Sequence, residues 1–188
     1  MSVEQLDAWG GLVADSVGGL LVSAEPQRRP SLGVTAQVVP VPLEVLSADQ
    51  IEAFAVGSLE NRAGLGEWGE KFRRAVETWR RDMLAAMESG SAAVSAEVEL
   101  CAIRLGPCGL VAVNAEAFCN FTDEIRAQAD APVYTIGYAN GLAGYLPTEA
   151  AFAEGGYEVE LAHLFYGGFR MRRGNLEHLA EMAAGLLR

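Results

Sequence analysis

The sequence predicts an α/β fold, in which a mixed sheet with hairpins is covered by long amphipathic helices. Apolar residues recur every three or four positions over residues 67–88 and 174–187, which is the spacing of a helix with one buried face. Apolar and polar residues alternate over 94–105, and a compact apolar run follows at 110–113. These two segments together indicate a β-hairpin.

The length and composition of the chain are those of a single globular domain spanning residues 1–188. Of its 188 residues, 51% are hydrophobic and 21% are charged, which is enough to bury one sizeable core. The net charge is −11 and the only lysine is Lys71. Because such a surface repels phosphate groups and anionic lipids, nucleic acids and membrane surfaces are poor partners.

The cysteines and the apolar N-terminal run indicate where in the cell the protein is expected. Three cysteines without a Cys-x-x-Cys spacing favour free thiols in a reducing compartment, so we expect a cytoplasmic protein. The run over residues 12–22 contains Asp15 and follows acidic rather than basic residues. It therefore resembles neither a signal peptide nor a membrane-spanning helix.

Two elements are expected before residue 47. Residues 4–22 place apolar side chains at helical spacing, although two glycine pairs weaken the pattern. Apolar and polar residues alternate over 32–46, which is the pattern of a strand. Pro40 and Pro42 lack the N–H group that a central strand donates, so this strand is expected at an edge of the sheet.

Two helices are expected next. Ser47 is a typical N-cap for a short helix over residues 47–56. The segment 67–88 carries the strongest helical pattern in the chain. Its polar face is expected to be solvated and to form ion pairs within the helix rather than a binding patch. That face carries Glu67, Glu70, Lys71, Arg73, Arg74, Glu77, Arg80 and Arg81.

The sequence after the hairpin predicts four further secondary-structure elements. Residues 118–129 indicate a short helix and 132–138 a buried strand. Thr148 is positioned to cap a helical turn over 148–153. An amphipathic helix over 174–187 ends the chain.

The stretch from Tyr134 to Glu160 is the best candidate for a functional site. Turns are expected at Asn140-Gly141 and at Gly155-Gly156. Tyr145 and Tyr157 each follow a glycine, and glycine lets the backbone approach a ligand or another chain closely.

Several short motifs follow one another in the C-terminal half of the chain. Their sequence and order resemble those in the C-terminal half of the catalytic domain of the neutral/alkaline non-lysosomal ceramidases, which are zinc-dependent amide hydrolases. The resemblance covers roughly residues 95–187 and implies half of a larger ceramidase-like α/β domain. It is carried by Val111–Glu116, a helix, Gly137–Asn140, Gly144–Thr148 and Gly155–Glu158.

The resemblance implies roles for three residues. The family's zinc-binding glutamate ends a Pro-Gly-Glu triplet, of which the segment Asn114-Ala115-Glu116 keeps only the carboxylate. The family's metal-binding tyrosine falls on Tyr145. A second tyrosine, which in the family lies close to the substrate amide, falls on Tyr157.

The family's two zinc-binding histidines and its substrate-binding arginine belong to an N-terminal half that this chain lacks. His163 and His178 both follow the motifs and are expected in the core and on the surface, respectively. Glu116 and Tyr145 alone provide two oxygen ligands, whereas catalytic zinc needs about three protein ligands and prefers nitrogen or sulfur donors. Zinc is therefore expected only if a partner supplies histidines.

Plainer interpretations exist for each candidate residue. Glu116 could stabilise a helix N-terminus, and the two tyrosines could simply pack with satisfied hydroxyl groups. Cys119 lies near an expected helix start, but no histidine stands beside it in sequence to act as a base. The basic run over residues 170–173 could bind an anion but is most simply a solvated loop.

Three hypotheses for function follow. The preferred one is the C-terminal subunit of a split ceramidase-like zinc amidohydrolase, inactive alone and completed by a histidine-bearing partner that forms the complementary N-terminal half. The second is an inactive binding or scaffold protein that self-associates as a homodimer, which the altered triplet before Glu116 favours. The third is a fragment of a longer enzyme, which the initiator-like Met1 disfavours.

Overall fold

A computed structural model describes residues 2–26, 30–60 and 66–188, which belong to two compact units, Met1–Pro30 and Ser31–Arg188. The first unit contains the expected N-terminal helix, α1 (Val3–Ser23). The Ser2 hydroxyl accepts a hydrogen bond from the Gln5 amide, and the Gln5 side chain accepts one from the Ser2 amide. This reciprocal capping satisfies two amide donors at the start of the helix.

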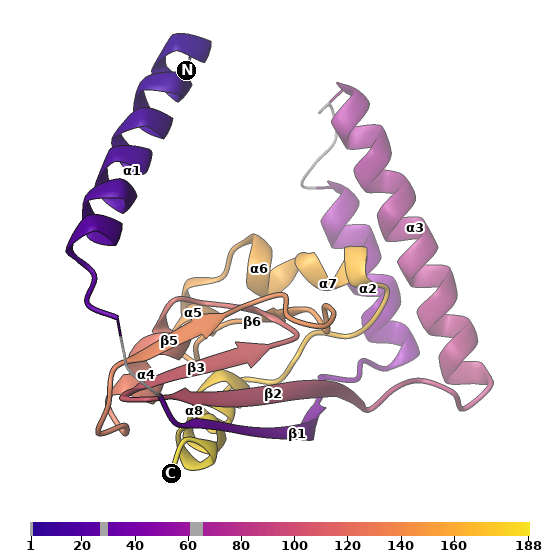
Figure 1. The fold of residues 1–188 in the computed structure, drawn as a ribbon. Coiled ribbons are helices and arrows are strands. Elements are labelled where there is room, and N and C mark those ends of the chain that lie inside the picture. Colours follow the sequence, from indigo (N-terminus) through magenta and orange to yellow (C-terminus); the bar gives the residue numbers. More distant parts are fainter. Residues whose placement is uncertain (1, 27–29, 61–65) are drawn as a thin grey trace. The chain divides into compact units, whose positions relative to one another are not determined.

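The second unit is built on a mixed four-stranded sheet in the order β1-β2-β3-β5 (Figure 1). β1, β2 and β3 pair antiparallel, whereas β3 and β5 pair parallel. The α/β fold with a mixed sheet and a hairpin is therefore confirmed. So is the edge position of the strand that contains two prolines. The strands are β1 (Leu32–Pro42), β2 (Ser95–Leu105), β3 (Cys108–Val113) and β5 (Val133–Ile136).

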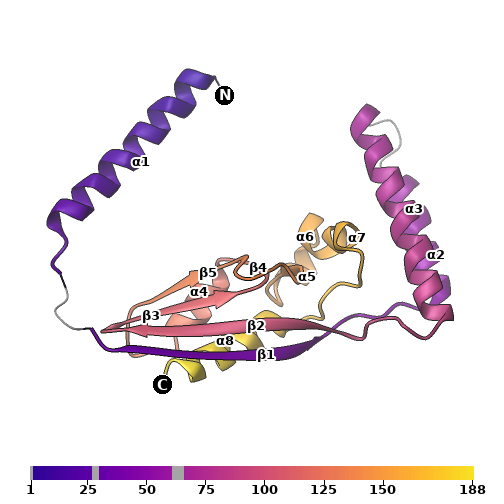
Figure 2. The ribbon, with the colours of Figure 1, turned by 45° about the vertical axis from the view of Figure 1, so that its right-hand side comes forward.

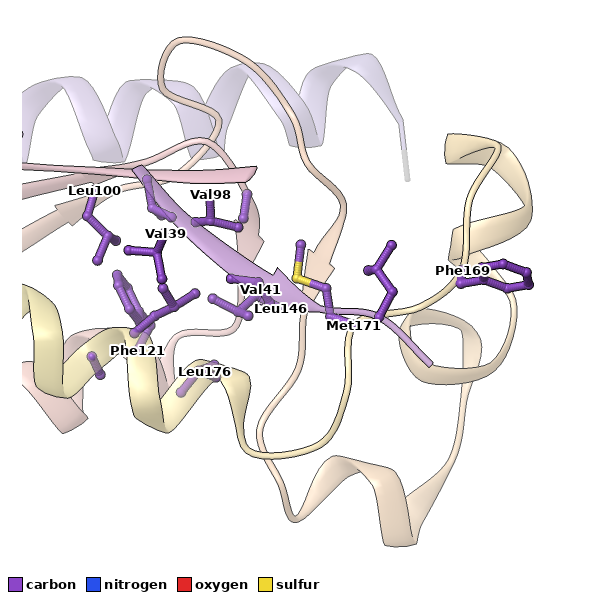
Figure 3. Packing of buried hydrophobic residues seen from close by; sticks show 14 of the residues in the cluster. Val39, Val41, Val98, Leu100, Phe121, Leu146, Phe169, Met171 and Leu176 are labelled. Carbon is purple, nitrogen blue, oxygen red and sulfur yellow. The ribbon is translucent and has the colours of Figure 1, made fainter. Parts of the chain in front are cut away.

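Two helices, α4 (Asn120–Arg126) and α8 (Asn175–Leu186), lie on the same side of this sheet (Figure 2). A hydroxyl–hydroxyl hydrogen bond of 2.5 Å between Thr122 and Thr135 joins α4 to β5. Between helices and sheet lies the main apolar core (Figure 3), whose members include Val39, Val41, Val98, Leu100, Phe121, Leu146 and Leu176.

The opposite face of the sheet keeps large apolar side chains in contact with water. The strand expected to be buried, β5, is buried at Val133 but exposed at Tyr134 and Ile136. Side chains of a strand alternate between the two faces, and helices α4 and α8 cover only one of them. The expectation of a wholly buried strand was therefore wrong.

A pair of adjacent helices, α2 (Ala48–Glu60) and α3 (Gly66–Glu88), precedes β2 (Figures 1 and 2). Ser47 caps α2 as expected, because its hydroxyl accepts a hydrogen bond from the Gln50 amide over 3.3 Å. On the buried side of α3, the Trp79 indole donates to the Gly168 carbonyl over 2.8 Å. On the exposed side the expected helical ion pairs form between Lys71 and Glu67, Arg73 and Glu70, Arg73 and Glu77, and Arg74 and Glu70.

Short elements connect the sheet to α8. The Thr148 hydroxyl accepts a hydrogen bond from the Ala151 amide over 3.1 Å, in agreement with its expected capping role. Among residues 2–26, 30–60 and 66–188, no helix combines the length and apolar character needed to cross a membrane. The connecting elements are β4 (Glu116–Ala117), β6 (Tyr145–Leu146), α5 (Ala151–Glu154), α6 (Tyr157–Glu160) and α7 (Ala162–Tyr166).

Candidate functional site

A short parallel strand pair brings two of the candidate residues together. In β4 and β6, Glu116 lies directly opposite Tyr145. The Glu116 amide donates to the Gly144 carbonyl over 2.9 Å, and the Phe118 amide donates to the Leu146 carbonyl over 3.2 Å. Because neighbouring strands are about 4.8 Å apart, these bonds hold the two side chains side by side.

The Glu116 carboxylate is surrounded by tyrosine hydroxyl groups. The Tyr166 hydroxyl donates to Glu116 Oε2 over 3.0 Å, and the hydroxyls of Tyr138 and Tyr145 also interact with this carboxylate. Burial by itself would raise the pKa of Glu116, but the three hydroxyl groups outweigh it and lower the pKa. Glu116 is therefore an anion at neutral pH.

The same contacts raise the pKa of each surrounding tyrosine. For Tyr138 and Tyr145 the main cause of the higher pKa is the hydrogen bond to Glu116, because losing the proton would leave two negative charges together. For Tyr166 the main cause of the raised pKa is burial, followed by its bond to Glu116. All three phenols remain protonated donors at neutral pH.

Tyr157 lies beside this cluster and packs against Tyr145. Their ring centroids are 6.1 Å apart with the planes at 85°, an edge-to-face contact, and Tyr166 packs on Tyr145 at the same centroid distance. Tyr157 opens α6 directly after Gly156, whose φ of 107° is open to glycine but disfavoured for other residues. The Tyr157 side chain is 45% exposed, so it can reach another molecule.

Tyr138 reaches Glu116 from a strained backbone. Its φ is 57° and that of Asn140 is 64°, both in the left-handed region that non-glycine residues rarely occupy. The Ala139 amide donates to the Val113 carbonyl over 3.0 Å, and Asn140 Nδ2 donates to Glu99 Oε1 over 2.7 Å. These contacts hold the strained loop against the end of β3, as expected where strain is retained at a site.

The structure therefore unites the three candidates Glu116, Tyr145 and Tyr157, and adds Tyr138 and Tyr166. A signal for the two additional tyrosines was present in the sequence. Tyr138 follows Gly137 and Tyr166 precedes Gly167, which is the same pairing of tyrosine with glycine that drew attention to Tyr145.

Zinc is a poor fit to this cluster as it stands. No group of three histidine, cysteine, aspartate or glutamate side chains that could hold a metal occurs among the residues that the structure describes. Glu116 and Tyr145 supply only oxygen atoms, and the hydroxyl groups already occupy the carboxylate. Tight zinc binding would need nitrogen ligands from outside this part of the chain.

Neither histidine joins the cluster. His163 is buried, with its ring centroid 5.3 Å from that of Phe54 and 5.5 Å from that of Trp79. Burial lowers the pKa of His163 to about 4; the positive charge of Arg170 adds to this and Glu44 opposes it. His178 is exposed on α8. The expectation of one core and one surface histidine is confirmed.

A cavity of about 220 Å³ adjoins the tyrosine cluster. The Tyr145 and Tyr166 side chains line it, and most of its exposed lining is apolar. Its polar lining also includes Glu158, His163 and Arg170. A cavity of this size is somewhat smaller than typical small-molecule sites, which occupy about 300 to 1,000 Å³. It could take a short acyl or aromatic group next to the hydroxyls.

The basic run at residues 170–173 and Cys119 make contacts that support the fold. Arg170 pairs with Glu44 over 2.8 Å, and Arg172 Nε donates to the Leu43 carbonyl over 3.1 Å, so the basic run anchors the segment after β1. Cys119 is the N-cap residue of α4, and its thiol lies 3.8 Å from Asn120 Oδ1. No hydrogen bond links Cys119 to a histidine in the described part of the chain.

Comparison with known proteins leaves this geometry as the basis for any functional conclusion. No protein-family model, curated protein or solved structure matches the chain.

Proposed function

We propose that this chain is the C-terminal subunit of a split amide hydrolase of the ceramidase-like type, inactive alone and completed by a histidine-bearing partner. The observation that carries the proposal is the convergence of Glu116, Tyr145 and Tyr157. These residues belong to β4, β6 and α6, and the chain brings them together although 41 positions separate Glu116 from Tyr157. Three residues chosen from the sequence alone would not in general lie next to one another in the fold.

The chain's own residues suit three tasks in amide hydrolysis. The Glu116 carboxylate keeps its negative charge and can face a cation at the interface. Tyr145 can share that cation through its hydroxyl oxygen, and the exposed Tyr157 hydroxyl can donate to the substrate carbonyl as negative charge develops there. Zinc held by partner histidines would acidify a water molecule for attack on the carbonyl.

The proposal places this pair of polypeptides in the cytoplasm. Cys101, Cys108 and Cys119 are free thiols in the structure, and free thiols are typical of proteins in reducing compartments. The partner would meet the exposed side of the tyrosine cluster, where Tyr138 and Tyr157 are accessible.

A second candidate function is supported by a different observation. The Glu116 carboxylate already accepts a hydrogen bond from Tyr166 and interacts with the hydroxyls of Tyr138 and Tyr145, so it has partners within this chain. This favours a non-enzymatic binding or scaffold protein that has kept the cluster as a structural feature.

One experiment separates the two functions. The tagged full chain is purified from its source, and the captured complex is assayed for zinc content and for hydrolysis of N-acyl amides. If the chain is part of a split hydrolase, the complex should contain zinc and hydrolyse the amide, and Glu116→Gln should strongly lower both. The control Glu124→Gln, which changes an exposed carboxylate on α4, should leave both unchanged. A complex without zinc and without activity would support the scaffold function instead.

A further inference from the structure

Within the unit Ser31–Arg188, the sheet face opposite α4 and α8 is mostly apolar and exposed. We call it the open face. Val34 is 60% exposed and Tyr134 is 53% exposed. The apolar part of the face ends at Glu99 and Glu97 of β2, which lie on the same face opposite Val38 and Pro40. The face comprises Leu32, Val34, Ala36, Val38, Cys101, Ile103, Leu105, Cys108, Leu110, Ala112, Tyr134 and Ile136.

Such a face is unusual for a sheet that remains in water. Antiparallel sheets with one solvated face alternate apolar residues with polar ones, whereas β3 is apolar on both sides. Large exposed apolar patches mark interaction sites. The composition of the open face is therefore that of a surface covered by another layer.

The open face is smaller than the whole sheet, because its members span residues 32–38 of β1 and shorter stretches of the other three strands. Seven residues at about 3.3 Å each give a length of about 23 Å, and three spacings of about 4.8 Å between four strands give a width of about 14 Å. The flat footprint is about 300 Å² per copy, to which the protruding side chains add, so the interface is smaller than the roughly 800 Å² per partner of standard interfaces.

The strand register arranges the open face into a ridge and a trough. One row across the four strands has large side chains: Val34, Ile103, Leu110 and Tyr134. The adjacent row begins with three small side chains, those of Ala36, Cys101 and Ala112, and ends at Ile136. Because the two rows are two residues apart along each strand, the ridge and the trough lie side by side.

This pattern is complementary to itself. A two-fold axis that runs parallel to the rows, midway between them, places the ridge of each copy over the trough of the other. The same rotation reverses the strand direction. Glu99, in the row after the trough, therefore faces the row of Leu32, Leu105 and Cys108 in the other copy and not its own counterpart, and Glu97 lies beyond that row.

We propose that the open face is the interface of a homodimer, in which two sheets pack face to face with ridge in trough. The proposal does not depend on the proposed function. Glu116 and Tyr145 belong to the separate two-stranded sheet β4-β6 and are not members of the open face.

The first test is the mass of the purified full chain in solution, by light scattering and sedimentation over a range of concentrations. The wild type should have the mass of two chains. Ile103→Lys places a charge in the ridge and should raise the dimer dissociation constant by about 100-fold or more. Ala36→Glu in the edge strand should do the same. Thr35→Lys, on the other side of β1, should leave the dimer intact.

The second test uses the chain's own thiols. Cys101 lies in the trough, whereas Cys119 is exposed outside the open face. Alkylation of Cys101 should be slow in the dimer and should accelerate at least about tenfold in Ile103→Lys, in proportion to the dissociated fraction. The rate at Cys119 should not change. Circular dichroism and thermal melting confirm that each variant is folded.

Three results would overturn the proposal. One is a wild-type chain that is monomeric at every concentration. Another is a dimer that survives both Ile103→Lys and Ala36→Glu. The third is protection of Cys101 that persists in the monomer, which would show that this face is covered in some other way.

Discussion

The Tyr166 hydroxyl donates a hydrogen bond to Glu116 Oε2 over 3.0 Å, across 50 positions of sequence. Tyr166 ends α7 and Glu116 begins β4, so the contact ties the last connecting helix to the sheet region. Tyr138 and Tyr145 approach the same carboxylate from two further segments. The carboxylate is thus the common partner of three hydroxyls that are distant along the chain.

Removing one donor should make the Glu116 carboxyl less acidic. In Tyr166→Phe the pKa of Glu116 should rise toward its ordinary value, although Tyr138 and Tyr145 continue to lower it. Carbon NMR of the labelled carboxyl group measures this shift. Tyr134→Phe, which removes an exposed hydroxyl on β5, is the control and should leave the Glu116 pKa unchanged. An unaltered pKa in Tyr166→Phe would contradict the hydrogen bond.

Most helices and strands could be predicted from the sequence because their periodicity records which side is buried. The patterns at 67–88 and 94–105 match α3 and β2 to within one residue. The short elements β4, β6, α6 and α7 could not be predicted in this way. Segments of two to five residues are too short to show a period, and their conformation depends on contacts with distant residues.

The site was predictable only in part, for a related reason. Glycine beside tyrosine marked Tyr145 and Tyr157, but their approach to Glu116 depends on the pairing of β4 with β6. Tyr138 reaches the cluster through a backbone with positive φ, which sequence patterns do not predict for a tyrosine. The exposure of one sheet face could not be predicted, because an apolar strand has the same sequence pattern whether or not a further layer of its own chain covers that face.

His163 should make the stability of the protein depend on pH. Its pKa is about 4 in the folded chain and 6.5 ordinarily, so the unfolded chain takes up a proton first as the pH falls. The free energy of unfolding should therefore decrease from pH 6.5 to pH 4, by on the order of 3 kcal/mol, and level off below that. Urea denaturation at several pH values measures the effect.

The matched variants separate His163 from the carboxyl groups that titrate over the same range. His163→Phe should lose this part of the pH dependence, because no imidazole remains to take up the proton. His178→Gln, at the exposed histidine of α8, should keep it. Equal pH profiles for the wild type and His163→Phe would show that the buried imidazole does not titrate differently on unfolding.

The ion pair between Glu44 and Arg170 should contribute modestly to stability. It joins positions 126 apart over 2.8 Å, and its side chains are 40% and 34% exposed, respectively. Because water screens such a pair, Glu44→Gln should lower the free energy of unfolding by about 1 kcal/mol at pH 7. Glu67→Gln, which breaks a fully solvated helical pair with Lys71, should cost less than about 0.5 kcal/mol. A larger loss in the control would contradict this ranking.

Trp79 should be among the residues most sensitive to substitution. Its side chain is 1% exposed, and the indole N–H donates to the Gly168 carbonyl in the segment after α7. Trp79→Phe removes the donor, leaves that carbonyl without its bond and opens space beside Phe54, so unfolding should become about 2 to 3 kcal/mol easier. Trp68→Phe, at a tryptophan of the same helix that is 52% exposed, should cost under about 1 kcal/mol. Chemical denaturation followed by circular dichroism compares the two, and equal losses would mean that the buried hydrogen bond does not fasten α3 to this segment.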